Sequence, residues 1–119
     1  MAEITGTDSG EELIGTDEDD TINGLGGDDQ IDGGGGNDVL NGGLGFDTIL
    51  GGLGNDTITD DDGYDTIDGG DGDDTITVFI QNDPDTSEPH GSVNAGAGND
   101  QLFISHTLFH KQLSTSHTS

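Results

Sequence analysis

The sequence predicts an all-β fold built from short repeating units, and three observations support this prediction. Residues 6–77 consist of eight consecutive nine-residue copies without insertion or deletion, and a ninth copy begins at Ala95. Each copy has an aliphatic residue at its eighth position, within a short stretch that suits a strand. Glycine and aspartate, which favour turns, dominate the first six positions. Each copy is therefore expected to be one turn followed by one strand.

The register of the copies is strict. From Gly6 they read GTDSGEELI, GTDEDDTIN, GLGGDDQID, GGGGNDVLN, GGLGFDTIL, GGLGNDTIT, DDDGYDTID and GGDGDDTIT, and the copy at Ala95 reads AGAGNDQLF. Position 6 is acidic in every copy: Glu11, Asp20, Asp29, Asp38, Asp47, Asp56, Asp65, Asp74 and Asp100. Position 8 is aliphatic in every copy: Leu13, Ile22, Ile31, Leu40, Ile49, Ile58, Ile67, Ile76 and Leu102. Because side chains alternate along a strand, position 8 is predicted to form the core and positions 7 and 9 the surface.

The composition excludes an ordinary packed core. Only 26% of the 119 residues are hydrophobic, 23 are glycine, and tryptophan is absent. A single domain of this size usually needs disulfides, a metal ion or a partner to fold. Because the chain has no cysteine, a metal ion is the leading candidate.

The charge indicates which partners are expected. Asp and Glu total 26 against one basic residue, Lys111, so the formal net charge is −25. Such a balance normally favours disorder, but a disordered tail has no reason to keep an aliphatic residue at every ninth position. We expect divalent cations as partners, and we expect neither nucleic acid nor anionic membrane surfaces. No apolar run approaches the length of a membrane span, and no cleaved N-terminal signal is expected after Met1.

The period and the pattern resemble the RTX (hemolysin-type) calcium-binding repeat, G-G-x-G-x-D-x-U-x. The resemblance implies a parallel β-roll, a right-handed β-helix-like solenoid in which two copies make one coil. Turns two copies apart would then lie about 4.8 Å apart with adjacent position-6 carboxylates. These carboxylates would repel each other strongly without a cation between them. Calcium suits such a gap because it takes six to eight carboxylate and carbonyl oxygens in flexible geometry.

The resemblance also implies the ligands of each ion. One turn would contribute the carbonyls of positions 2 and 4 and the carboxylate of position 6, and the turn two copies later the carbonyls of positions 1 and 3 and the carboxylate of position 6. The implied sets are Thr16, Glu18 and Asp20 with Gly33, Gly35 and Asp38; Leu25, Gly27 and Asp29 with Gly42, Leu44 and Asp47; Gly34, Gly36 and Asp38 with Gly51, Leu53 and Asp56; Gly43, Gly45 and Asp47 with Asp60, Asp62 and Asp65; Gly52, Gly54 and Asp56 with Gly69, Asp71 and Asp74; and Gly70, Gly72 and Asp74 with Ala95, Ala97 and Asp100. About six Ca²⁺ ions are therefore expected.

Three copies depart from the pattern. The first copy has Ser9 for glycine and Glu11 for aspartate, which weakens a seventh site that would join this turn to Gly24, Gly26 and Asp29. The second copy has Glu18 at position 4, and the seventh copy opens with two aspartates at residues 60–61 instead of two glycines. Aspartate tolerates left-handed backbone better than most residues, so these sites are expected to be weakened and not lost.

Residues 78–94 interrupt the repeats. Counting back nine residues from Leu102 places Val93 at the core position, so residues 92–94 are predicted to form a strand after an enlarged turn at 78–91. Residues 95–103 form the ninth copy, and residues 104–119 are expected to cap the open end of the solenoid. The alternative for this tail is a remnant of the C-terminal secretion signal of RTX proteins. His106 and His110, four residues apart, and His90 are interpreted as exposed histidines and not as metal ligands.

We find no catalytic constellation, because the acids are explained by the repeat and neither GxSxG nor GK[ST] occurs. The resemblance implies a secreted, extracellular bacterial module that leaves through the type I secretion machinery and folds on binding calcium. The alternative is a structural or adhesive array that binds a polysaccharide or ice through outward threonines. These threonines occupy position 7: Thr21, Thr48, Thr57, Thr66 and Thr75. An enzyme using paired carboxylates is the third hypothesis, and a homo-oligomer formed through an exposed end or sheet face stays open.

Overall fold

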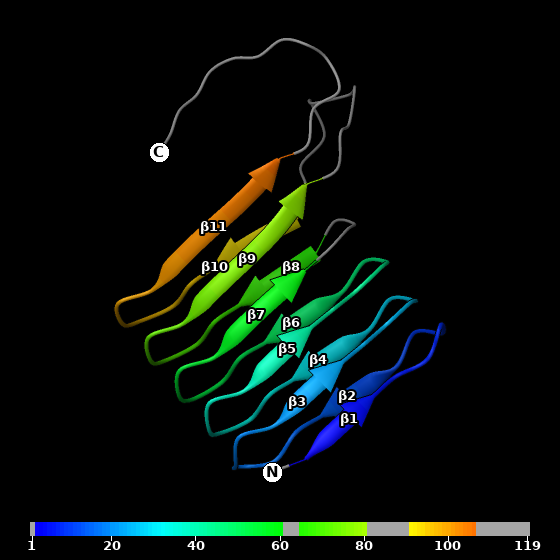
Figure 1. The fold of residues 1–119 in the computed structure, drawn as a ribbon, viewed down its shortest axis with the longest axis horizontal. Helices are drawn as coiled ribbons and strands as arrows, with labels where there is room; N and C mark the ends of the chain where they lie inside the picture. Colours follow the sequence, from blue (N-terminus) through cyan, green and yellow to red (C-terminus); the bar gives the residue numbers. More distant parts are fainter. Residues whose placement is uncertain (1, 61–64, 81–90, 107–119) are drawn as a thin grey trace, which may run out of the picture.

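The computed structural model describes residues 2–60, 65–80 and 91–106, and within them every regular element is a strand (Figure 1). The strands are β1 (Glu3–Thr5), β2 (Glu12–Ile14), β3 (Thr21–Asn23), β4 (Gln30–Asp32), β5 (Val39–Asn41), β6 (Thr48–Leu50), β7 (Thr57–Asp60), β8 (Asp65–Asp68), β9 (Thr75–Ile80), β10 (Gly91–Asn94) and β11 (Gln101–His106). The all-β prediction is confirmed.

The strands form two parallel sheets that the chain visits in turn. One sheet has the order β1-β3-β5-β7-β9-β11 and the other β10-β8-β6-β4-β2. Strands within a sheet pair in parallel, for example Ile22 with Leu40 and Ile31 with Ile49, so one coil takes two copies of the repeat. Figure 1 shows the two layers and the turns that connect them along two opposite edges. The predicted parallel β-roll is confirmed.

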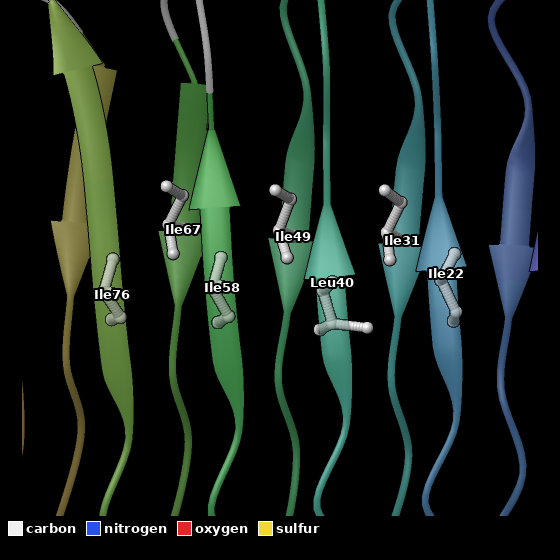
Figure 2. Close-up of a cluster of buried hydrophobic side chains, with 7 residues drawn as sticks. All are labelled: Ile22, Ile31, Leu40, Ile49, Ile58, Ile67 and Ile76. Carbon is white, nitrogen blue, oxygen red and sulfur yellow. The ribbon is translucent and has the colours of Figure 1, made fainter.

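A single layer of aliphatic side chains fills the space between the sheets (Figure 2). The residues of this layer, each at most 1% exposed, are Ile22, Ile31, Leu40, Ile49, Ile58, Ile67 and Ile76. All occupy position 8, as predicted, because alternate strand residues point inward. At the ends of the roll the layer is incomplete. Leu13 is half-buried. Leu102 lies on β11, the last strand of its sheet, where it pairs with Ile76 of β9, and it is 46% exposed.

Two features of the ends differ from the sequence analysis. Strand β1 precedes the first copy and pairs with β3, and its half-buried Ile4 packs against the core nine residues before Leu13. Strand β11 pairs with β9 as far as His106, so residues 104–106 continue the sheet. The rest of the expected cap, residues 107–119, and residues 81–90 of the enlarged turn lie outside the described residues. Strand β10 contains the strand expected at 92–94, and its Val93 pairs with Ile67. Residues 78–80 and 91, expected in the enlarged turn, belong to β9 and β10.

The turns depend on glycine at positions 2 and 4. Gly52 has φ +88°, and a Cβ added there would collide with the carbonyl oxygen of Gly34 in the preceding turn of the same edge. Gly34, Gly36 and Gly54 have similar positive φ values. Position 3 differs, since Leu44 and Leu53 occupy it. The close stacking of the turns therefore favours glycine at positions 2 and 4, although Leu25 at position 2 of the third copy also has a positive φ, of +70°.

We predict that Gly52→Ala destabilises the folded roll by about 1–2 kcal/mol or more, because left-handed backbone and the carbonyl collision act together. Gly35→Ala is the matched control, since its Cβ would meet its nearest neighbours at 3.3 Å and its φ is ordinary. Thermal unfolding at saturating calcium measures both variants. Equal melting temperatures for the two variants would contradict this account of the turns.

Candidate metal sites along the two edges

Turns two copies apart stack directly on each other. The backbone N–H of position 3 donates to the carbonyl of position 2 in the preceding turn of the same edge. These bonds run from Gly35 to Thr16 (3.0 Å), Leu44 to Leu25 (2.8 Å), Leu53 to Gly34 (2.9 Å) and Asp71 to Gly52 (3.1 Å). Asp71 also forms a parallel bridge with Ala97. The turns that contribute to each implied ligand set therefore lie side by side, although Asp62 of one set lies outside the described residues.

The position-6 aspartates form a ladder along each edge. One carboxylate oxygen, Oδ1, accepts the position-6 N–H of the preceding turn on the same edge. On one edge the donor–acceptor pairs are Asp20–Asp38 (2.8 Å), Asp38–Asp56 (2.9 Å), Asp56–Asp74 (2.8 Å) and Asp74–Asp100 (2.7 Å), and on the other Asp29–Asp47 (2.8 Å) and Asp47–Asp65 (2.7 Å). The ladder holds like charges in two buried rows.

The second carboxylate oxygen, Oδ2, is buried with no hydrogen-bond partner among the described residues at Asp29, Asp38, Asp47, Asp56 and Asp74. A buried ionised oxygen without a partner is costly. The one Lys or Arg side chain of the sequence, Lys111, lies outside the described residues. A bound cation would satisfy these oxygens.

A small space lined by oxygens lies beside most of the position-1 glycines. A Cβ built on Gly33 would lie 2.7 Å from Asp38 Oδ2 and 2.8 Å from the carbonyl oxygen of Gly51. The same pair of oxygens, from the aspartate of one turn and from position 1 two copies later, surrounds Gly15, Gly24, Gly51 and Gly69. The unpartnered carboxylate oxygen and a carbonyl thus converge where a side chain is missing. An all-oxygen donor set of this kind suits calcium better than zinc, which prefers nitrogen and sulfur.

The interior aspartates differ from ordinary surface acids in their pKa. Burial, with a smaller contribution from neighbouring aspartates, raises the pKa of Asp47 and Asp56 to about 7 and that of Asp74 to about 6. Burial also raises the pKa of Asp29 and Asp38. Without a cation, Asp47 and Asp56 are therefore partly protonated near neutral pH.

The first copies depart from this pattern. The backbone N–H of Thr16 donates to Asp20 (2.6 Å) and is the main reason why the pKa of Asp20 is lowered. Both carboxylate oxygens of Glu11 accept hydrogen bonds from Thr7, at 2.8 Å from its N–H and 2.7 Å from its hydroxyl. The repeat pattern predicted weakened sites in the first copy, because of Ser9 and Glu11, and in the second copy, because of Glu18, but it did not distinguish the Asp20 carboxylate from the interior aspartates.

Two features of the edges were missed. Position-5 side chains form their own ladder, in which Oδ1 accepts the N–H of position 5 in the next turn of the same edge. These acceptor–donor pairs are Asp19–Asn37 (2.7 Å), Asn37–Asn55 (2.8 Å), Asn55–Asp73 (2.8 Å) and Asp73–Asn99 (2.9 Å). The recurrence of Asp or Asn at position 5 was the available signal. The second feature is the side chain of Asp60, to which the sequence analysis gave only a carbonyl role although it is fully buried.

A family model described as the RTX calcium-binding nonapeptide repeat matches residues 5–40, 14–49 and 50–78, which together span residues 5–78 without a gap. The chain belongs to the RTX calcium-binding repeat family. RTX repeats bind Ca²⁺ and are structural, so this chain is a calcium-binding β-roll module, and such repeats are typical of secreted bacterial proteins. The comparisons with curated proteins and with solved structures gave no match. Among the described residues of this RTX chain, no helix is long and apolar enough to cross a membrane.

We predict that the metal-free RTX chain gains β-structure as the pH falls from about 7 towards 3.8. The pKa of Asp47 and Asp56 in the roll is about 7, against an ordinary value of 3.8, so the roll binds protons that the unfolded chain does not. The stability contributed by these groups is present at low pH and is lost as the pH rises through their raised pKa. Far-UV circular dichroism of the chelator-treated protein measures the transition.

The same protons compete with the ion, so the affinity for calcium should fall over the same pH range. A transition centred near the ordinary value of 3.8 would contradict the prediction, because ordinary surface carboxylates would then control it.

Proposed function

We propose that this RTX chain is a calcium-dependent folding module, open when calcium is scarce and folded into the β-roll when the edge sites fill. The observation that supports this most strongly is the set of five buried Oδ2 atoms without hydrogen-bond partners among the described residues. Such oxygens oppose folding of the metal-free chain at neutral pH and favour it once a cation binds.

The thin core supports the same conclusion. The roll has one layer of seven fully buried aliphatic side chains, while the chain contains 23 glycines that lose much conformational freedom on folding. Without disulfides, the free energy of ion binding is the natural source of the missing stability, so binding and folding are coupled.

The ligand sets support a stoichiometry of about six ions. Each set combines two stacked turns, and each central aspartate, such as Asp38 or Asp56, belongs to two sets and would bridge two ions. We do not assign a seventh ion to the first turn, because the carboxylate of Glu11 is already hydrogen-bonded to Thr7.

We further propose that the module belongs to a bacterial protein exported by a type I secretion machinery. RTX repeats are typical of secreted bacterial proteins. A calcium-dependent fold would keep the chain open in the calcium-poor cytoplasm and close it outside the cell. The absence of cysteine is compatible with this route, since the fold does not depend on disulfides.

A second candidate function is an adhesive surface that binds a polysaccharide or ice. Strands β7 and β9 pair Thr57 with Thr75 and Thr59 with Thr77, and β6 and β8 pair Thr48 with Thr66. These short rows stop where Val39 pairs with Thr57 and Gln30 with Thr48. Replacing Thr57 and Thr75 by valine would abolish such binding and leave calcium-dependent folding intact.

A calcium titration of the chelator-treated protein, followed by far-UV circular dichroism, tests the folding module. We predict a cooperative coil-to-β transition with calcium and none with magnesium at the same concentrations, because magnesium requires a tighter octahedron and keeps its water. Complete β-structure in chelator, or an equal response to magnesium, would refute the proposal.

A matched pair of variants tests whether the ladder of position-6 aspartates sets the affinity for calcium. Asp56→Asn removes the charge from a central bridging carboxylate, so we predict that the midpoint of the calcium titration rises by about tenfold. Asp73→Asn makes the same charge change at position 5, where Asn37 and Asn55 already serve as acceptors, and should leave the midpoint almost unchanged. Equal shifts for the two variants would show that overall charge, and not the ladder, sets the affinity.

A further inference from the structure

Asp60 occupies position 1 of its copy, where most other copies have glycine. It is the last residue of β7 and is 0% exposed. At the equivalent Gly24, Gly33 and Gly51, a Cβ would lie 2.6–2.7 Å from the Oδ2 atom of the position-6 aspartate in the same turn. A side chain at position 1 therefore enters the space that the other turns leave open beside their carboxylates.

The carboxylate of Asp60 lies beside those of Asp47 and Asp65. One carboxylate oxygen from each residue lies within 4.8 Å of the other two, and all three residues are buried. Within residues 2–60, 65–80 and 91–106, no other group of three acidic or histidine side chains meets this condition. Asp47 Oδ2 is buried without a hydrogen-bond partner among these residues, which points independently to a missing cation.

The backbone adjusts at this position. The N–H of Gly42 donates to the carbonyl of Thr59 at 3.2 Å, whereas the equivalent bonds from Gly24, Gly33 and Gly51 are all 2.8 Å long. Among these equivalent backbone hydrogen bonds, the one next to Asp60 is therefore the longest. The Asp60 side chain is accommodated inside the edge and is not turned out to solvent.

We propose that Asp60 contributes its side-chain carboxylate to the calcium ion held between Asp47 and Asp65, and that this centre is the tightest calcium site of the roll. The proposal rests on the proposed function, in which calcium fills the edges. Three carboxylates surround this ion, against two in the other sets, and calcium affinity rises with the charge of the ligands. The ion also neutralises a buried cluster that would otherwise repel itself strongly.

The site has a direct spectroscopic readout. A trivalent lanthanide matches three carboxylates in charge and prefers oxygen ligands, so Tb³⁺ should occupy this centre first. The sequence has one tyrosine and no tryptophan, and Tyr64 directly precedes Asp65. Tb³⁺ luminescence excited through tyrosine therefore reports on this centre, and competition with calcium gives the calcium affinity of the site.

The test compares the wild-type chain with Asp60→Gly, which restores the common residue of the repeat, and with Asp60→Asn, which keeps the volume and removes the charge. We expect the dissociation constant for calcium at this site to rise by about tenfold or more in both variants. The matched control is Asp28→Asn, because Asp28 is exposed on the same edge and an asparagine can still accept the N–H of Phe46. The control should bind like the wild type.

Unchanged or tighter binding in Asp60→Gly would overturn the proposal, because Asp60 would then only fill space. If Asp60→Gly does not fold at saturating calcium, Asp60→Asn decides in the same way. Circular dichroism of the same samples distinguishes failure of this inference from failure of the proposed function. Variants that fold with calcium but keep the wild-type affinity overturn the inference alone, whereas a wild-type chain without any calcium response overturns the proposed function as well.

Discussion

The structure depends on two rows of buried carboxylates that repel each other unless a cation lies between them. The parallel pairing that aligns Ile22 with Leu40 also aligns Asp20 with Asp38, because the two members of each pair are 18 residues apart in the sequence. A continuous core and a continuous ladder of charge are therefore consequences of the same register. The fold cannot form one without forming the other, and this is the basis of the proposal that a cation stabilises it at neutral pH.

The glycines reflect the same constraint. Position 1 stays empty so that a carboxylate and a carbonyl can converge, and positions 2 and 4 take positive φ so that successive turns can stack. These glycines make the unfolded chain unusually free, and they leave the folded chain with little apolar area. In the proposed function, ion binding at the ladder supplies the stability that the thin core lacks, and the sharing of Asp38 and Asp56 between ions would make folding cooperative.

The N-terminal end of the roll differs from its middle in how its carboxylates are satisfied. Asp20 accepts N–H groups from Ala2 and Thr16, and Glu11 is bonded to Thr7, so the first turns satisfy their acids with protein groups. Among the described residues, no such donor reaches Oδ2 of Asp29, Asp38, Asp47, Asp56 or Asp74. We infer that the demand for calcium is greatest in the central coils, where Asp47, Asp56 and Asp60 lie, and that these coils govern folding of the whole module.

The sequence was sufficient to predict the β-roll, its core and the stacking of the turns, because each depends on a strict period. Ile4 was missed since no turn of the repeat precedes it, although it lies nine residues before Leu13. The exposure of Leu102 was not foreseen, because burial in the last coil depends on a covering neighbour and not on the position within the repeat. The role of the Asp60 side chain was also missed, because the pattern treats position 1 as backbone and only the three-dimensional arrangement places this side chain beside Asp47 and Asp65.

Anomalous diffraction from crystals of the calcium-loaded protein would test the central claim most directly. The account predicts calcium peaks in two rows, each peak between position-6 carboxylates of turns two copies apart, such as Asp38 and Asp56. Ions found only on the outer sheet faces, or carboxylate rows that carry no calcium in the folded protein, would contradict it.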